Sequence, residues 1–233
     1  MFNNVSFKLY KGEILGVAGL IGAGRTEVMR AAFGADPYDS GECLMDGKPY
    51  KAKTPKDTIK KGLGLIPEDR RGQGLLLEKN VKENTSLASL FANSNHGFIN
   101  FGWEKQESVS YIEKLRIKTP SELALLKNLS GGNQQKVVIA KWLLAKSRIL
   151  IMDEPTRGID VNAKSEIYAL MKEFVENGGS IILVSSELPE IIGCSNRIMV
   201  MREGVVTGFL EQDEATEERV MQFASKGTNQ EEK

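Results

Sequence analysis

The chain has 233 residues, enough for one large α/β domain or two small ones with a substantial core, and we favour one domain. Its 31 basic and 31 acidic residues give a formal net charge of zero, which does not favour a protein that binds nucleic acid by electrostatics. The single histidine, His96, falls in the polar stretch NSNHG, so catalysis built on histidine is not expected.

The cysteines and the apolar runs bear on the chain's surroundings. Cys43 and Cys194 lie far apart and lack metal-ligand spacing. A disulfide would require the fold to bring them together, and two reduced thiols are the favoured interpretation. No apolar run approaches the roughly 18 residues that span a bilayer, and the N-terminus lacks the build of a signal peptide, so we expect a soluble chain.

Four short apolar runs predict buried strands. In chain order they are EILGVAG, GLGLIPE, RILIMDE and SIILVSS, and each ends at a polar or glycine-rich turn. Runs that are apolar at nearly every position are typical of a parallel sheet covered by helices on both faces. SGECLMDGKPY, with its Asp46-Gly47 turn, and RIMVMREGVVTGFLE, with Glu203-Gly204, predict hairpins, so some antiparallel sheet should accompany the parallel one.

Helical patterns fill the spaces between these strands. VNAKSEIYALMKEFVENGG has apolar residues at helical spacing and stops at Gly178-Gly179, directly before a strand, as a right-handed βαβ unit requires. Residues 82–143 are mainly helical in pattern, including SVSYIEKLRI and NQQKVVIAKWLLAK, and indicate a helical insertion between core segments 1–81 and 144–233. The fold class is therefore α/β, and the tail after Ser225 is expected to be disordered.

The stretch GLIGAGRT, Gly19 to Thr26, fits the phosphate-binding pattern G-x-x-x-x-G-K-[ST], except that Arg25 stands in place of the lysine. Gly22 and Gly24, with Gly19, let backbone N–H groups converge on a phosphate, and the helix opening at Arg25 adds its positive end. The hydroxyl of Thr26 would bind Mg²⁺. Alone, the stretch fits a nucleotide site and a ligand-free glycine turn about equally well.

A pair of carboxylates follows the run RILIM. Asp153 and Glu154 come at the end of the predicted strand, where ligands bind in open parallel sheets. Asp153 is placed to hold Mg²⁺ through water, and Glu154 to polarise an attacking water. By itself such a pair would more often be a solvated strand end, but together with the glycine-rich loop it predicts a nucleotide site.

NLSGGNQQKVVIAKWLLAK predicts a second anion site. Ser130 is a good N-cap for the helix that follows, and the glycines could be a flexible entry to it. That explanation does not account for the two glycines and the amide-rich first turn, which expose N–H groups at a helix start. We infer two surfaces that close over a shared nucleotide.

These motifs together resemble a known family. LSGGNQQK, preceded by a P-loop and followed by IMDEPTRGID, is similar to the signature and Walker B motifs of ATP-binding cassette (ABC) ATPases, a highly specific combination. GLIGAGRT, PEDRRGQG, LSGGNQQKVVIAKWL, DEPTRGIDVNAK and VSSELPEI together resemble the second, C-terminal cassette of sugar importer ATPases of the ribose, galactose and xylose type. The similarity runs from about Phe2 to the last predicted helix.

The resemblance implies a fold and a domain organisation. The fold is a P-loop NTPase (RecA-like) core with a mainly parallel sheet, a small antiparallel β part and a helical subdomain. Residues 1–233 would form a single ABC ATPase domain, which we expect to be a fragment of a longer two-cassette protein. Such proteins usually carry a strand and an adenine-stacking aromatic upstream of FNNVSFKLYKGE, so Phe2, Phe7 and Tyr10 are only weak candidates for contact with the base.

The resemblance also implies a function. Two cassettes pair head to tail, with ATP between the P-loop of one and the signature of the other. This chain would bind and hydrolyse ATP with Mg²⁺ for a sugar importer. Its partners would be an N-terminal cassette, membrane-spanning permease subunits and, indirectly, a periplasmic or extracellular sugar-binding protein, but no nucleic acid. It would be cytoplasmic and peripheral on the inner face of the cell membrane.

The implied site residues fall into three groups. The catalytic group is Glu154, Glu68 and Ser186, and the metal ligands are Thr26, Asp153 and Glu68. The nucleotide contacts are Gly19, Leu20, Ile21, Gly22, Ala23, Gly24, Arg25, Thr26 and Glu27 in the P-loop, with Ser130, Gly131, Gly132, Asn133 and Gln134 at the signature.

Three departures from the family pattern predict a detuned site on this chain. Arg25 replaces the P-loop lysine, Glu68 stands where many cassettes have glutamine, and Ser186 replaces the histidine that senses the γ-phosphate. The signature is intact and would complete the competent site of the partner. Two alternatives stay open: a regulatory nucleotide-binding half without turnover, and a soluble ABC ATPase that does not serve transport.

Overall fold

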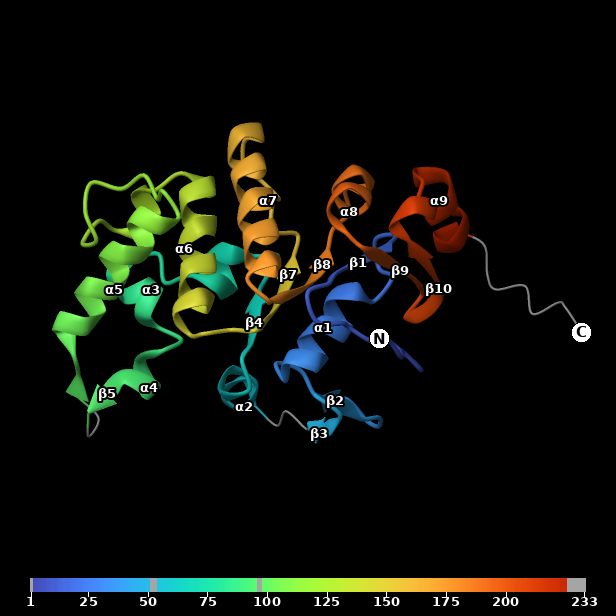
Figure 1. The fold of residues 1–233 in the computed structure, drawn as a ribbon, viewed down its shortest axis with the longest axis horizontal. Helices are drawn as coiled ribbons and strands as arrows, with labels where there is room; N and C mark the ends of the chain where they lie inside the picture. The colour runs from blue at the N-terminus through green and yellow to red at the C-terminus, as the bar shows by residue number, and fades with distance from the viewer. Residues whose placement is uncertain (1, 51–53, 96–97, 226–233) are drawn as a thin grey trace, which may run out of the picture.

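A six-stranded sheet, in the order β10-β9-β1-β8-β7-β4, organises the molecule in a computed structural model (Figure 1). The structure describes residues 2–50, 54–95 and 98–225. The strands of this sheet are β1 (Ile14–Gly19), β4 (Leu63–Ile66), β7 (Ile149–Asp153), β8 (Ser180–Val184), β9 (Arg197–Arg202) and β10 (Val205–Glu211).

The predicted parallel sheet is confirmed. β1 runs parallel to both β8 and β9, and β7 runs parallel to β8 and β4. All residues of β4 and β8 are buried, as expected for strands covered on both faces. The four predicted apolar runs form β1, β4, β7 and β8.

The two predicted hairpins form, but they belong to different sheets. The Asp46-Gly47 turn joins β2 (Cys43–Met45) to β3 (Lys48–Tyr50) in a separate two-stranded antiparallel sheet. The Glu203-Gly204 turn joins β9 to β10, but β9 is also paired in parallel with β1. The second hairpin therefore forms the antiparallel edge of the main sheet and is not a separate unit.

Helices cover the sheet on two sides. In Figure 1, α7 and α8 lie on one side of the strands and α1 on the other. The helices that flank the strands are α1 (Arg25–Phe33), α2 (Pro55–Lys60), α6 (Gly131–Leu144), α7 (Val161–Glu176), α8 (Leu188–Cys194) and α9 (Glu217–Ser225). The core between them is formed by large side chains with almost no exposure, including Leu15, Met29, Leu150 and Leu183.

The segment between β4 and β7 is mainly helical, as the sequence predicts. Besides α6 it contains α3 (Val81–Ser86), α4 (Leu90–Asn93), α5 (Phe101–Lys114), the short helices η1 (Arg70–Gly74) and η2 (Leu126–Asn128), and a small antiparallel pair, β5 (Ser94–Asn95) and β6 (Phe98–Ile99). α3, α4 and α5 lie at one end of the molecule, and α9 lies at the other (Figure 1). A short 3-10 helix, η3 (Gln212–Glu214), precedes α9.

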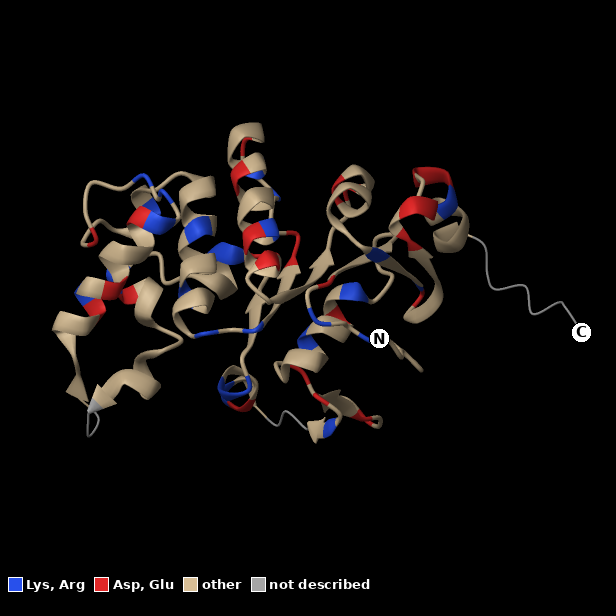
Figure 2. Ribbon diagram, in the orientation of Figure 1, with Lys and Arg blue, Asp and Glu red and all other residues tan. Residues whose placement is uncertain are grey.

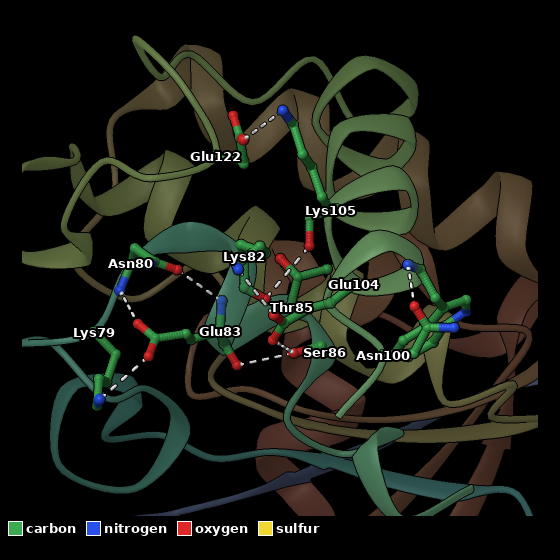
Figure 3. Close-up of polar contacts among 12 residues, drawn as sticks. Lys79, Asn80, Lys82, Glu83, Thr85, Ser86, Asn100, Glu104, Lys105 and Glu122 are labelled. Carbon is green, nitrogen blue, oxygen red and sulfur yellow. Dashed lines mark hydrogen bonds and ion pairs between the residues drawn. The ribbon is translucent and has the colours of Figure 1, made fainter. Parts of the chain in front are cut away.

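A buried polar network joins α3 to α5. The Glu104 carboxylate accepts a hydrogen bond from the Ser86 hydroxyl at 2.7 Å and forms an ion pair with Lys82 at 3.0 Å (Figure 3). Glu104 is only 3% exposed, so its charge is compensated inside the helical segment. An Asn80 and Glu83 capping box, also drawn in Figure 3, begins α3.

Several other expectations can be checked. Cys43 and Cys194 are free, so no disulfide joins them. His96 and the tail after Ser225 lie outside the described residues. None of the helices in the described part of the chain combines the length and the apolar character needed to cross a membrane.

Candidate active site

The candidate site lies at the carboxyl ends of three neighbouring parallel strands. β1 leads into the glycine-rich loop Gly19–Thr26, β7 ends at Asp153, and β8 is followed by Ser185 and Ser186. Since β1 pairs with β8 and β8 with β7, the sheet brings these three segments to one edge. In the sequence these groups belong to separate motifs, and the strand order brings the motifs together.

Glycine is required at specific points of the loop. Gly22 and Gly24 have φ angles of 81° and 88°, a region that glycine enters without strain. A Cβ on Gly19 would collide with the backbone carbonyl of Met201 on β9, so this position needs glycine for close approach. These constraints define a tight strand-to-helix loop.

The rest of the loop presents backbone N–H groups at the start of α1. The first N–H of α1 with a helical partner belongs to Val28, which donates to the Gly24 carbonyl over 3.2 Å, so the earlier N–H groups of the helix lack an intrahelical acceptor. Leu20 and Ile21 form the exposed tip, with Ile21 97% exposed. Ala23 is buried below the tip, whereas the Glu27 side chain is exposed. The loop therefore offers a site that favours anions.

Arg25 does not point freely from this loop. Its Nη1 donates a hydrogen bond to the backbone carbonyl of Ser185 over 2.8 Å, which ties the start of α1 to the end of β8. A lysine ammonium carries its donors on a single nitrogen, whereas the planar guanidinium can bond Ser185 through one nitrogen and donate in another direction through a second. The substitution noted in the sequence thus has a structural partner that the sequence does not reveal.

Asp153 fits a role as a magnesium ligand. Its side chain is 2% exposed, and its Oδ1 has no hydrogen-bond partner among the described residues. Burial raises the pKa of Asp153, while a hydrogen bond from Thr26 and the charge of Arg25 act in the opposite direction. A buried carboxylate oxygen without a partner, beside a hydroxyl, suits Mg²⁺, which needs only one or two protein ligands when it binds with phosphates. Among the residues that the structure places, no group of three His, Cys, Asp or Glu could hold a metal.

Glu154 has an unusual backbone conformation. Its φ is 48°, in the left-handed region that non-glycine residues rarely adopt. Its N–H donates to the Val184 carbonyl over 2.8 Å, and one carboxylate oxygen accepts a hydrogen bond from the Ser186 hydroxyl over 3.2 Å. Burial raises the pKa of Glu154, which suits a group that must accept a proton or polarise water.

Glu68 lies at the same sheet edge but is already paired. It follows β4, and its carboxylate accepts a hydrogen bond from the guanidinium of Arg157, in the loop after β7. Both side chains are solvent-accessible, at 41% and 65%. Arg157 was not among the sequence-predicted site residues, although it lies within the DEPTRG stretch.

The signature segment lies beside the loop after β7. Ser130 occupies the N-cap of α6 as predicted, but its side chain makes no capping hydrogen bond; its hydroxyl accepts instead from the Asn133 amide over 2.9 Å. Ser130 is exposed, whereas Gln134 is 1% exposed and donates to the Leu126 carbonyl over 3.0 Å. The buried side chain of Gln134 therefore links the start of α6 to η2 and does not face solvent.

Packing explains the two glycines of the signature. A Cβ on Gly131 would lie 2.8 Å from Nη2 of Arg70, and one on Gly132 would lie 2.5 Å from the Cβ of Ala163. Arg70 also donates to the Arg157 carbonyl over 2.7 Å. The glycines thus let the start of α6 approach η1 and α7 closely. This close approach is a reason for them that does not depend on a bound anion.

The three aromatic candidates for base contact differ in position. Asn3, next to Phe2, donates to the Gly204 carbonyl over 2.8 Å, and Gly204 donates to the Ala23 carbonyl over 3.0 Å, so Phe2 is tied to the P-loop edge. Tyr10 precedes the amino end of β1 and stacks on Arg197, whose guanidinium carbon lies 4.9 Å from the ring centroid. Tyr10 therefore lies at the opposite edge of the sheet. Phe7 is partly buried against the core.

Comparison with known proteins gives consistent results. A family model described as ABC transporter matches residues 2–157. The chain is 53% identical over 230 residues to the ribose import ATP-binding protein RbsA of Oceanobacillus iheyensis, covering 99% of this chain and 46% of that protein. It is 52% identical over 227 residues to a putative ribose/galactose/methyl galactoside import ATP-binding protein of Rhizobium etli, covering 97% of this chain and 43% of that protein. The chain thus spans about half the length of the curated relatives it matches.

A solved structure shares the fold. It is the dimeric, post-hydrolysis structure of an ATP-binding cassette bound to ADP and Pi, with a TM-score of 0.78, 20% sequence identity, and coverage of 91% of this chain and 90% of that chain. This likeness concerns the fold alone. The likeness shows that the chain has the fold of an ATP-binding cassette, and the matching family model shows that it belongs to the ABC transporter family.

Proposed function

We propose that this chain binds and hydrolyses ATP with Mg²⁺ as one cassette of a sugar importer. The observation that carries the proposal is the meeting of three elements at one sheet edge: an anion-binding loop, the unpartnered Oδ1 of Asp153, and the half-buried carboxylate of Glu154. Thr26 and Asp153 would hold Mg²⁺, which when bound neutralises charge on the phosphate oxygens. Glu154 would polarise the attacking water, and Phe2 is the aromatic best placed to contact the base.

We further propose that this chain's own site turns over slowly. The Arg25 guanidinium already bonds the Ser185 carbonyl, so it is shared between the phosphates and the backbone. Ser186 offers a neutral hydroxyl where a charged imidazole would bind phosphate more strongly. Glu68 is engaged by Arg157, and its negative charge does not favour a nearby polyphosphate. Removing one preorganised contact of this kind typically costs about 3 to 4 kcal/mol of activation free energy.

The signature would act on a partner cassette. A polar cleft of about 170 Å³ lies between the starts of α6 and α7, lined by residues that include Ser130, Asn133 and Asp160. The start of α7 is capped by the Asp160 carboxylate, whereas the start of α6 has no side-chain capping bond, so the first N–H groups of α6 favour an anion brought by a second surface. We propose that this surface is the P-loop of an N-terminal cassette, with this chain as the C-terminal half of a two-cassette protein. The lengths of the curated relatives support that arrangement.

A second surface would dock on the permease. A mainly apolar cleft of about 400 Å³ lies between α1, α2, α3 and α6, with Phe33, Leu87 and Trp142 among its lining residues. The exposed Phe91 lies beside it, with the Lys56 ammonium 4.6 Å from its ring centroid. An exposed apolar patch of this kind favours a protein contact. We propose that membrane-spanning subunits bind here, so the chain would be peripheral on the cytoplasmic face of the membrane.

The distribution of charge supports a protein partner over nucleic acid. Basic and acidic residues are interspersed along α5 and α7 (Figure 2), and the formal net charge is zero. A soluble ABC ATPase acting on nucleic acid would instead be expected to present a basic surface. Salt-sensitive binding to nucleic acid, without binding to permease subunits, would favour that alternative.

Calorimetry and turnover test the proposal. ATP with Mg²⁺, at ~100 times its dissociation constant, should raise the free energy of unfolding by roughly 2.7 kcal/mol. The chain should hydrolyse ATP slowly alone and faster when mixed with its N-terminal partner. Glu154→Gln should abolish hydrolysis by the isolated chain while leaving ATP binding intact. Binding without any hydrolysis by the isolated wild-type chain would favour the regulatory alternative, and no binding would contradict the proposal.

A further inference from the structure

A buried hydrogen bond links the loop of Glu154 to α8. The Thr156 hydroxyl donates to Oε1 of Glu190 over 2.8 Å. Thr156 is 1% exposed and Glu190 is 4% exposed, so the bond is shielded from solvent. Thr156 lies two residues after Glu154, and Glu190 lies in the helix that follows Ser186. The bond therefore joins the two segments that flank the candidate site.

A third element completes this buried cluster. Burial raises the pKa of Tyr168, on α7, and the charge of the neighbouring Glu190 raises it further. Oε2 of Glu190 has no partner within the described part of the chain. Three elements thus meet at one carboxylate behind the site, and none of these side chains belongs to the nucleotide-binding motifs.

The cluster is costly if its only role is packing. A buried carboxylate with one oxygen unpartnered is expensive, and an apolar side chain of similar volume is often as stable or more stable. A directed hydrogen bond, in contrast, fixes the relative position of the groups it joins. The cluster therefore favours a role in fixing the position of the loop after Glu154 relative to α8.

The backbone next to Thr156 has a geometry that needs such fixing. Glu154 has a φ of 48°, and non-glycine residues keep this conformation only where the surroundings impose it. Two backbone bonds flank it: Glu154 N–H to the Val184 carbonyl at 2.8 Å, and Arg157 N–H to the Glu154 carbonyl at 3.1 Å. Thr156 lies inside the turn that the second bond closes, and its side chain is the anchor of that turn to α8.

We propose that Thr156 and Glu190 are positioning residues that hold the Glu154 loop in its strained conformation, so that the Glu154 carboxylate faces the site. The assignment of Glu154 to ATP hydrolysis rests on the proposed function, but the coupling between Thr156, Glu190 and the Glu154 backbone does not. Neither residue touches the nucleotide in this account.

Amide hydrogen exchange measured by NMR tests the coupling without any need for turnover. Thr156→Val keeps the shape but removes the hydroxyl, and Glu190→Met removes the acceptor. In each, the Glu154 and Arg157 amides should exchange at least about tenfold faster, while amides in β7 stay within about twofold of wild type. The double variant should be no faster than either single variant, because both remove one bond. Thr156→Ser should restore slow exchange.

Thr58→Val is the matched control. Thr58 is fully buried, and its hydroxyl bonds the Phe33 carbonyl over 2.7 Å, so it too links two elements. This variant should leave the Glu154 amide unchanged. Unchanged Glu154 exchange in both Thr156→Val and Glu190→Met, or an equal acceleration of all amides, would overturn the proposal. Should one of these variants fail to fold, the other decides the test.

Steady-state kinetics then separate positioning from binding. In the isolated chain, Thr156→Val should lower kcat about tenfold or more with KM for ATP within about twofold, and Thr156→Ser should recover kcat. Equal loss of kcat in Thr58→Val would point to a merely structural effect and contradict the proposal. If the wild-type chain hydrolyses no ATP, the proposed function fails, whereas the exchange experiment still decides whether Thr156 and Glu190 hold the Glu154 loop.

Discussion

Nη1 of Arg25 donates a hydrogen bond to the backbone carbonyl of Ser185 over 2.8 Å. This bond connects the first residue of α1 with the residue after β8, across the edge at which Asp153 and Glu154 also lie. The cation of the glycine-rich loop is thus engaged by the protein itself. Two consequences of the site's electrostatics can be measured, together with one of the buried Lys141 and one of the buried network in the helical segment.

Arg25→Lys should make the chain's own site faster. Lysine would release the Ser185 carbonyl and direct a compact ammonium toward phosphate. Gaining one charge-assisted contact should increase the rate of ATP hydrolysis and the affinity for ATP by about tenfold or more. Calorimetry and single-turnover kinetics measure the two effects. Arg25→Ala, which supplies no cation, should weaken binding, and an unchanged or slower Arg25→Lys variant would show that the Ser185 bond does not limit the site.

Asp153→Asn should stabilise the chain when Mg²⁺ and nucleotide are absent. Burial raises the pKa of Asp153 in the folded state, so its contribution to stability is present below its unfolded pKa and is lost as the pH rises through its folded pKa. At neutral pH the amide avoids this penalty, and a gain of about 1 kcal/mol corresponds to a Tm increase of roughly 2–4 °C. Between pH 4 and pH 8, the Tm should fall less steeply for the variant than for the wild-type chain. The exposed Asp39→Asn serves as control, and a lower Tm for Asp153→Asn at pH 7 would contradict the argument.

Lys141 should give the opposite dependence on pH. Burial lowers the pKa of Lys141 to about 8, while its ammonium donates to the Gly74 carbonyl over 2.7 Å. The folded state then binds fewer protons than the unfolded state between about pH 8 and the ordinary lysine pKa, so stability from this group rises with pH across that window. Between pH 7 and pH 10, the free energy of unfolding of the wild-type chain should therefore rise relative to that of Lys141→Met, by on the order of 1–3 kcal/mol. Urea unfolding measures it; a constant difference would exclude the effect.

Glu104→Ala should destabilise the helical segment. Lys82 would remain largely buried without its partner, and breaking a buried ion pair from one side costs about 3–5 kcal/mol. Adding Lys82→Met should recover part of the loss. Glu78→Ala, which breaks an exposed pair with Lys127, should cost less than about 1 kcal/mol in the same urea titration. Equal costs for the two variants would mean that the network in Figure 3 contributes no more than a surface pair.

Much of the fold follows from local patterns. The four apolar runs were predicted as strands because strands buried on both faces need apolar side chains at nearly every position. Their shared carboxyl edge followed from their being parallel, which is why Asp153 and the glycine-rich loop could be placed together. The local pattern predicts the hairpin at Glu203-Gly204, but it does not predict that β9 also pairs with β1, because this pairing joins residues that are far apart in the sequence.

The sequence predicts which residues belong to the candidate site but carries no signal for the contacts between them. The partner of Arg25 is a backbone carbonyl, which has no sequence signal of its own. The pairing of Glu68 with Arg157 joins two loops, and the anchoring of Thr156 by Glu190 joins a loop to a helix. Gly131 and Gly132 suggested an anion site, whereas their neighbours Arg70 and Ala163 supply a packing reason as well.

We propose that the signature of this chain contributes more to ATP hydrolysis by the two-cassette assembly than Glu154 does. Steady-state ATP hydrolysis by the chain assembled with the proposed N-terminal cassette tests this, using Ser130→Arg and Glu154→Gln side by side. Ser130→Arg should lower the rate of the assembly more than tenfold, because it fills the cleft at the start of α6, whereas Glu154→Gln should lower it by less than about twofold. The reverse order, with Glu154→Gln severe and Ser130→Arg mild, would contradict the account.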